Sequence, residues 1–268
     1  MTPSLSIATW NVNSVKVRLP QLLDFLKDDA PDILLLQELK CQSEAFPREE
    51  IEMLGYNLAI HGQKTYNGVA ILSKLPLEDI STILPDDPAP DQARYIEAVV
   101  SLPHNQALRI ASVYVPNGQE VGSDKFDYKL AFMTALHHHM EALLLQEEML
   151  VIGGDYNVAP ENIDVYDPVA SAGSICFHPL ERAAFRAMLY SGMTDAYRAL
   201  YPDTQQFSWW DYRAGAFQQN KGLRIDHLLL SPQAADRLEN CAVVEKMRKL
   251  EKASDHAPVI CKFSLNNV

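Results

Sequence analysis

The feature that most constrains the fold of this chain is a series of short apolar runs that alternate with segments of helical periodicity. Several runs, such as DILLLQ and EMLVIGG, are apolar on both faces, which is typical of strands buried inside a layered protein. Strands are predicted at residues 6–10, 32–37, 68–73, 95–102, 108–115, 148–154, 224–231 and 258–263. Helices are predicted at residues 19–29, 47–54, 124–147, 180–190 and 233–240.

Some predicted strands follow each other without a helix between them, which disfavours a simple doubly wound sheet. A layered α/β protein with mixed sheets fits the pattern better. The sequence contains no internal repeat and no long flexible linker, and the proline-rich acidic stretch 84–92 is predicted to be an exposed loop. We therefore predict a single domain over residues 1–268.

Composition narrows the class of protein. No run approaches the roughly 18 apolar residues of a membrane span, and the first residues lack the features of a signal peptide. The four cysteines are far apart, which disfavours zinc or disulfides and predicts a cytoplasmic protein. A net charge of −12 argues against binding nucleic acid through the overall field, but it allows a local basic face.

Polar side chains recur where the predicted strands end. Glu38 ends the run DILLLQ, and a carboxylate buried there needs a cation, a hydrogen-bond donor or solvent. The carboxamides and carboxylate of Asn11, Asn13 and Asp255 offer hard oxygen ligands, which Mg²⁺ or Mn²⁺ prefers. The alternative is that each of these residues only forms a turn.

The motif GGDYNVAP follows another buried run. Gly153 and Gly154 are predicted to turn the chain sharply out of the strand. Asp155 and Asn157, two residues apart, can point the same way. An acid beside a fixed amide is suited to holding and deprotonating a water molecule. A plain Asp/Asn turn remains the alternative.

The stretch FSWWDYRAGAFQQNKGLRID combines five aromatic residues with three basic residues. Such a combination offers stacking platforms and phosphate contacts for nucleic acid. The alternative is that Trp209 and Trp210 are core residues; on a strand the two cannot face the same way. Near the C-terminus, Asp255 and His256 can serve one site only if SDHA is an irregular turn ahead of a strand that begins at Pro258.

A family resemblance rests on these motifs together: ATWNVNS, LLLQELK, HGQKTYNGVAILS, VYVPNG, GGDYNVAP, FSWWDYR, GLRID and SDHAP. Their order resembles that in the exonuclease III and abasic-site endonuclease branch of the endonuclease/exonuclease/phosphatase superfamily, over about residues 6 to 263. The resemblance implies an α/β fold with four layers. Two mixed β-sheets pack face to face, helices cover the outer faces, and the site lies at one end of the sheets.

The resemblance also implies roles for individual residues around a metal ion. Glu38 resembles the principal Mg²⁺ ligand, Asn11 assists it, and Asp255 resembles a second carboxylate on the metal side. Asp155 is similar to the residue that activates the attacking water, and Asn157 to one that orients water or phosphate. Mg²⁺ is the expected cofactor, with Mn²⁺ as a substitute.

Further roles concern the substrate. Tyr114 resembles a tyrosine at the scissile phosphate, and His256, oriented by Asp226, a histidine that stabilises developing charge on the phosphate. The residues expected to contact DNA are Asn117, Trp209, Trp210, Leu223, Arg213, Lys125 and Arg94. Among them, Trp209, Trp210 and Leu223 correspond to the lining of the family's sugar pocket.

The implied activity is that of a Mg²⁺-dependent 3′–5′ exodeoxyribonuclease with abasic-site endonuclease and 3′-phosphatase activity in base excision repair. The expected partner is double-stranded DNA with abasic sites or 3′ ends, bound by a monomer and not at a membrane. Two alternatives stay open: hydrolysis of other phosphate esters, such as lipids or inositol phosphates, and a catalytically silent RNA-associated regulator. Residues 167–179 diverge from the family pattern, which leaves the balance of activities open.

Overall fold

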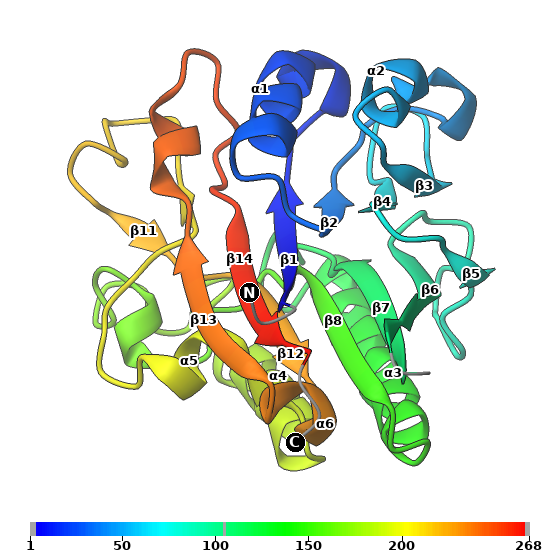
Figure 1. Ribbon diagram of the computed structural model, residues 1–268. Coiled ribbons are helices and arrows are strands. Elements are labelled where there is room, and N and C mark those ends of the chain that lie inside the picture. The colour runs from blue at the N-terminus through cyan, green and yellow to red at the C-terminus, as the bar shows by residue number, and fades with distance from the viewer. Residues whose placement is uncertain (1–3, 104–105, 266–268) are drawn as a thin grey trace.

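The computed structural model describes residues 4–103 and 106–265, and within those ranges no helix is long and apolar enough to cross a membrane. Two six-stranded mixed sheets form the centre of the molecule (Figure 1). The first sheet consists, in spatial order, of β13 (Leu238–Val243), β14 (Val259–Ser264), β1 (Ser4–Asn11), β2 (Ile33–Gln37), β4 (Val69–Ser73) and β3 (Asn57–His61). The second consists of β5 (Glu78–Ser81), β6 (Tyr95–Leu102), β7 (Gln106–Tyr114), β8 (Met149–Asp155), β12 (Asp226–Leu230) and β9 (Thr194–Asp195).

Within these sheets β1 pairs with β2 and β7 with β8 in parallel, and the other strand pairs are antiparallel. A separate two-stranded ribbon joins β10 (Trp209–Trp210) to β11 (Gly222–Leu223). The helices are α1 (Val15–Asp28), α2 (Arg48–Glu52), α3 (Asp124–Leu144), α4 (Pro179–Tyr190), α5 (Ala196–Leu200) and α6 (Pro232–Ala235). In Figure 1, α1 and α2 lie on the side of the first sheet, and α3 and α4 on the side of the second.

Strand β2 shows why the chain forms four layers. All five of its residues are buried, and successive side chains enter different cores because a strand alternates its faces. Ile33 and Leu35 join the core between the two sheets, which also contains Val151 of the second sheet. Leu34 packs with Phe25 of α1 in the outer core of the first sheet. The predicted four-layer α/β sandwich is therefore confirmed.

The outer core of the second sheet is built in the same way. Phe132 of α3 and Phe185 of α4 pack with Ile152 of β8, and all three side chains are fully buried. This core fixes α3 and α4 behind the strand that ends at Asp155. Because β7 and β8 are parallel neighbours, the segments that lead from β7 into α3 and from β8 into α4 begin side by side.

Three sequence predictions need correction. The helix expected at 233–240 ends at Ala235, because the following residues form the edge strand β13 and pair with β14. Helix α1 begins at Val15, earlier than expected, with Pro20 inside it. Gly153 and Gly154 do not turn the chain but lie within β8. A Cβ atom on Gly154 would come within 1.9 Å of the Val113 carbonyl oxygen, so the strand packing requires a glycine there.

Candidate active site

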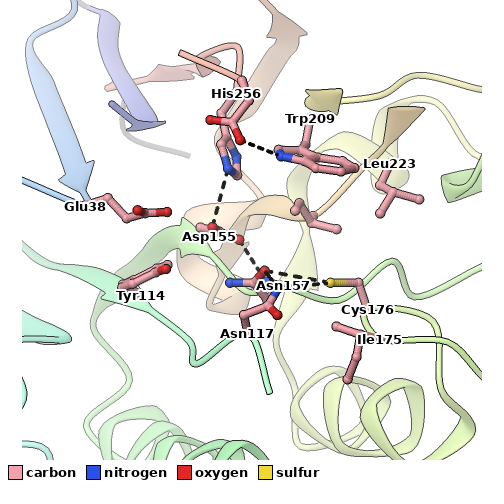
Figure 2. Close-up of a pocket in the computed structure, with 12 residues that line it drawn as sticks. Glu38, Tyr114, Asn117, Asp155, Asn157, Ile175, Cys176, Trp209, Leu223 and His256 are labelled. Carbon is pink, nitrogen blue, oxygen red and sulfur yellow. Dashed lines mark hydrogen bonds and ion pairs between the residues drawn. The ribbon is translucent and has the colours of Figure 1, made fainter. Parts of the chain in front are cut away.

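A pocket of about 380 Å³ lies where several strands of both sheets end (Figure 2). The residues that line it are Glu38, Tyr114, Asn117, Asp155, Asn157, Ile175, Cys176, Trp209, Leu223, Ile225, Asp255 and His256. Asp155 is the last residue of β8, Tyr114 is the last residue of β7, and Glu38 directly follows β2. The fold therefore brings together side chains that the sequence separates by more than 200 positions.

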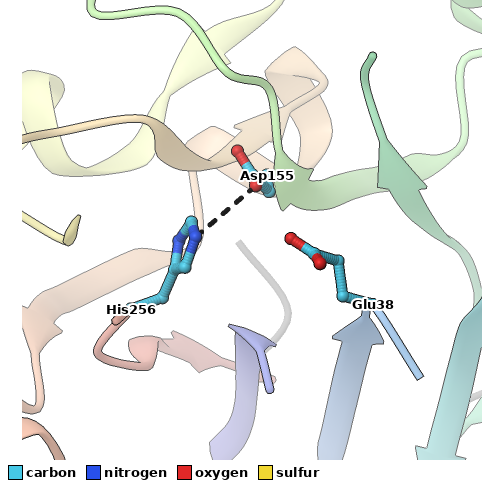
Figure 3. A group of neighbouring side chains, drawn as sticks. All are labelled: Glu38, Asp155 and His256. Carbon is cyan, nitrogen blue, oxygen red and sulfur yellow. Dashed lines mark ion pairs between the residues drawn. The ribbon is translucent and has the colours of Figure 1, made fainter. Parts of the chain in front are cut away.

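Glu38, Asp155 and His256 form the polar centre of this pocket (Figure 3). One potential ligand atom from each residue lies within 4.8 Å of the others. The amide nitrogen of Asn11 donates to Glu38 Oε1 at 2.8 Å and to Asp155 Oδ2 at 2.9 Å. Its oxygen accepts from the backbone amide of Asn13. Asn11 thus holds the two carboxylates together through its N–H groups, rather than directing its oxygen between them.

His256 is held between two carboxylates. Its Nδ1 is 2.9 Å from Asp226 Oδ2, and its Nε2 is 3.7 Å from Asp155 Oδ2. Burial alone would lower the pKa of His256, but the charges of Asp226 and Asp155 outweigh burial and raise it to about 10. Asp226 is itself oriented by Ser208, whose hydroxyl donates to Asp226 Oδ2 at 2.6 Å and accepts from two backbone amides. His256 is therefore an imidazolium at neutral pH.

The pKa of Asp155 is raised as well, but for this carboxyl group a raised pKa favours the neutral form. Burial is the largest cause that raises the pKa of Asp155 to about 7; the charges of Asp226 and Glu38 act in the same direction, and the attraction of His256 and the hydrogen bond from Asn11 oppose them. A carboxylate that titrates near neutrality can accept a proton and release it again under physiological conditions. Asp155 is 1 % exposed, but it lines the open pocket and can meet a bound water there.

Two asparagines form one wall of the pocket. Asn157 has a left-handed backbone conformation, with φ of 51°, and its backbone amide donates to Asp155 Oδ1 at 2.9 Å. Its side-chain amide donates to the carbonyl of Val115, and its Oδ1 accepts from Asn117 Nδ2 at 3.0 Å. Tyr114 lies beside them, and burial raises the pKa of its phenol well above the usual range, helped by nearby carboxylates. Tyr114 therefore stays a neutral hydrogen-bond donor.

Asp255 lies in an irregular segment directly before the isolated bridge between His256 and Trp209, as predicted for SDHA. Its Oδ1 accepts from Asn13 at 2.9 Å and its Oδ2 accepts from Trp209 Nε1 at 3.0 Å. Burial opposes ionisation, but His256, Asn13 and Trp209 lower the pKa of Asp255. Asp255 lines the pocket but is not in the group formed by Glu38, Asp155 and His256.

The two adjacent tryptophans, Trp209 and Trp210, lie in different environments. The side chain of Trp209 lines the pocket together with Leu223, to which it is paired across the β10–β11 ribbon. Trp210 is fully buried between Phe207 and Phe217 and donates to Asn220, away from the pocket. The prediction that Trp210 lines the sugar pocket is corrected by this position, since neighbouring residues of a strand face opposite sides.

Two hollows flank the central pocket and carry the predicted basic residues. One, of about 600 Å³, contains Arg94 and Lys125 and shares Tyr114 with the central pocket. The Arg94 guanidinium lies 4.8 Å from the centre of the Tyr114 ring. The other, of about 340 Å³, contains Arg213 and Lys221 beside Trp209. The side chain of Arg213 is 88 % exposed and paired with Asp211.

Sequence reasoning did not single out several residues that shape the site. Ser208 orients Asp226, Lys40 pairs with Glu38 Oε2 at 2.9 Å, and Ile175 and Cys176 form an apolar wall. Lys40 stands inside the motif LLLQELK, two residues after the candidate ligand Glu38, and that spacing was the available signal. Ile175 and Cys176 belong to the divergent segment 167–179, which offered no pattern of its own.

The geometry agrees with comparisons to known proteins. The chain matches the Endonuclease/Exonuclease/phosphatase family over residues 8–256 and belongs to that family. It is 34% identical over 267 residues to exodeoxyribonuclease III of Haemophilus influenzae, covering 97% of this chain and 100% of that protein. A solved 3′ phosphatase, NExo from Neisseria bound to a product DNA hairpin, is 42% identical, with a TM-score of 0.93 and coverage of 97% and 99%. An AP endonuclease from Archaeoglobus fulgidus is 36% identical, with a TM-score of 0.91 and coverage of 97% and 99%.

Proposed function

We propose that this protein is a Mg²⁺-dependent DNA phosphodiesterase, namely a 3′–5′ exodeoxyribonuclease that also removes 3′-phosphates and cuts at abasic sites. One observation carries the proposal. A buried carboxylate with a pKa of about 7 lies beside an imidazolium and a second carboxylate, in a pocket with an aromatic wall. The same family includes nucleases that act on DNA ends and abasic sites, and this chain matches them along nearly its whole length.

The donor set fits a hard divalent cation. Glu38 offers a carboxylate oxygen, and Asn11 holds the carboxylate of Asp155 close to it, so negative charge is concentrated where a divalent cation would bind, even with Lys40 paired to Glu38. Glu38 is the proposed principal ligand, with support from Asn11 and the negative charge of Asp255. Such an ion supplies neutralisation of phosphate charge and help for the departing 3′-oxygen. Mn²⁺ satisfies the same donors.

The protein's own groups carry the remaining steps. Asp155 accepts a proton from the water that attacks phosphorus. His256, kept protonated by Asp226, donates to a phosphate oxygen whose negative charge increases in the transition state. Asn157, Asn117 and Tyr114 supply neutral donors at the other side of the phosphate. Since these groups are already hydrogen-bonded into position, little reorganisation accompanies the reaction.

The apolar side of the pocket accounts for the proposed substrate. Trp209, Leu223 and Ile175 present a surface to which a deoxyribose without a base, or a terminal sugar, can bind. The cations of the flanking hollows, Arg94 and Arg213 among them, lie where a DNA backbone would continue on either side.

We further propose that the protein acts as a monomer in the cytoplasm, and size-exclusion chromatography coupled to light scattering tests the monomeric state.

Three defined duplexes test the activity: one with a recessed 3′ end, one with a 3′-phosphate and one with an internal abasic site. With Mg²⁺ the purified protein should release nucleotides from the recessed 3′ end, release phosphate from the 3′-phosphate and cut the strand at the abasic site. In excess chelator it should do none of these. Parallel assays on inositol phosphates and on a phospholipid headgroup test the alternative phosphodiesterase. Activity on those esters alone, or tight RNA binding without hydrolysis of any substrate, would contradict the proposal.

A further inference from the structure

Lys129 of α3 and Glu181 of α4 form an ion pair behind the pocket wall, and both side chains are 0% exposed. A buried charge is costly unless its partner and further hydrogen bonds satisfy it. The hydrogen bonds of this pair therefore indicate what stabilises it in the interior. They connect it to the backbone of the two loops that contain Asn117 and Asn157.

The ammonium group of Lys129 has three N–H donors, and each has an acceptor. One donates to Glu181 Oε1, one to the carbonyl oxygen of Asn157 at 2.7 Å and one to the carbonyl oxygen of Asn117 at 3.1 Å. The two asparagines that line the pocket are thus joined through their backbones to one buried cation. Gly118 allows this approach: its φ is +88°, and a Cβ atom there would lie 3.1 Å from Lys129 Cδ.

Glu181 extends the network to Cys176, which lines the pocket next to the two asparagines. Its carboxylate accepts from the backbone amide of Cys176 at 3.2 Å and from that of His178 at 2.9 Å. The sulfur of Cys176 lies 3.7 Å from Asn157 Oδ1, which is the atom that also accepts from Asn117. The single pair therefore fixes three pocket-lining residues that come from two separate loops.

We propose that Lys129 and Glu181 are a positioning pair, which sets the side chains of Asn117 and Asn157 for the phosphate; this role rests on the proposed function. Neither charge touches the substrate. The pair acts through the two carbonyl oxygens, because a backbone shift there moves the hydrogen bond from Asn117 to the Asn157 side chain and the one from the Asn157 backbone amide to Asp155. A misplacement of about 1 Å at a reacting group can cost on the order of 10²-fold in rate. The competing interpretation is that the pair only ties α3 to α4.

The test removes both charges at once, so that neither is left buried alone. A Lys129→Met/Glu181→Gln double variant is compared with Met188→Ala, a fully buried core position of α4 outside the network. Release of nucleotides from a recessed 3′ end is measured below the melting temperature of each protein. The double variant should lose at least about tenfold in kcat with less than a threefold change in KM, and the control should stay within about twofold of the parent.

Asn117→Ala in both backgrounds provides the readout that a merely structural pair would not change. The substitution should lower kcat by about tenfold or more in the parent but by less than about threefold in the double variant, because the effects of substitutions at coupled residues are not additive. If the double variant does not fold, Glu181→Asp, which keeps both charges but shortens the carboxylate side chain, replaces it as the second background. Three results would overturn the positioning role. Asn117→Ala lowers kcat equally in both backgrounds, or it does not lower kcat in the parent, or the double variant is as active as the Met188→Ala control. An inactive parent protein instead contradicts the proposed function and the role that rests on it.

Discussion

Asp155 and Asp226 lie directly opposite each other on the antiparallel strands β8 and β12, with the imidazole of His256 between their carboxylates. The strand register alone places one acid on each side of the ring. Asp226 is fully occupied by His256 and Ser208, whereas Asp155 also faces Asn11 and the open pocket. The same pairing thus gives one aspartate an orienting position and leaves the other available for chemistry.

Replacing Asp226 with Asn should lower the pKa of His256 from about 10 toward its ordinary value of 6.5 or below. The loss of the nearest carboxylate leaves burial, which disfavours the imidazolium, with less opposition. In the parent, the stabilisation from the paired imidazolium is complete below the unfolded pKa and fades as the pH rises through about 10. NMR titration of the ring in metal-free protein measures the shift. An unchanged pKa in Asp226→Asn would contradict this account.

An Asp155→Asn substitution should lower the rate of DNA hydrolysis by about 10²–10⁴-fold, because an amide cannot accept the proton of the attacking water. The fold should persist, since the side-chain oxygen of Asn can still accept from the Asn157 amide. Single-turnover assays measure the rate, and circular dichroism with thermal melting controls for folding. A folded variant that retains more than about a tenth of the parent rate would rule out water activation by Asp155.

The contributions of Glu38 and Asp255 to metal binding can be measured separately. Glu38→Gln should raise the Mg²⁺ concentration for half-maximal activity by at least about tenfold, because it removes a charged ligand next to Asp155. Asp255→Asn should raise it by less than about threefold, since both oxygens of Asp255 already accept hydrogen bonds from Asn13 and Trp209. Mg²⁺ titrations of the two variants provide the comparison. A larger effect in Asp255→Asn would make that residue a direct ligand.

The buried pair of Asp195 and Arg224 should make the stability of the protein sensitive to acid. Burial opposes ionisation of Asp195, but the Arg224 guanidinium, 2.7 Å away, holds its pKa well below the usual range. The carboxylate therefore stabilises the fold above its unfolded pKa of about 4 and does so less as the pH falls below that value. Asp195→Asn should cost about 3 kcal/mol at neutral pH and less at about pH 3. Urea unfolding at both pH values tests the difference; an equal cost at both would contradict the pairing.

Gly154→Ala should destabilise the protein by about 3 kcal/mol or more, because the added methyl group would overlap the carbonyl of Val113 on the neighbouring strand. The free energy of urea unfolding measures the effect. Gly173→Ala serves as a comparison in which the added Cβ meets nothing within 4 Å, although its φ of +75° carries some strain. If Gly154→Ala lowers the free energy of unfolding no more than Gly173→Ala does, then β7 and β8 can move apart to accept the methyl group.

Much of the fold could be predicted because its determinants are local. Short continuous apolar runs identify β2 and β8 without knowledge of their neighbours, and helical spacing identifies α3. The polar residues that end these runs, such as Glu38 and Asp155, are placed at one edge simply because the strands end there. Edge strand β13 was missed because a short amphipathic segment fits a helix or a strand equally well, until β14 is present to pair with it.

The sequence by itself determined the most buried strands, the hard oxygen donors at their ends and an aromatic stretch near them. The tertiary structure alone decided which atoms meet. Trp209 reaches the pocket while Trp210 enters a core, Asn11 donates to two carboxylates, and Lys129 joins the site from behind. The physical reason is that each side chain's hydrogen-bond partners come from distant segments, so its role depends on packing that no local pattern encodes.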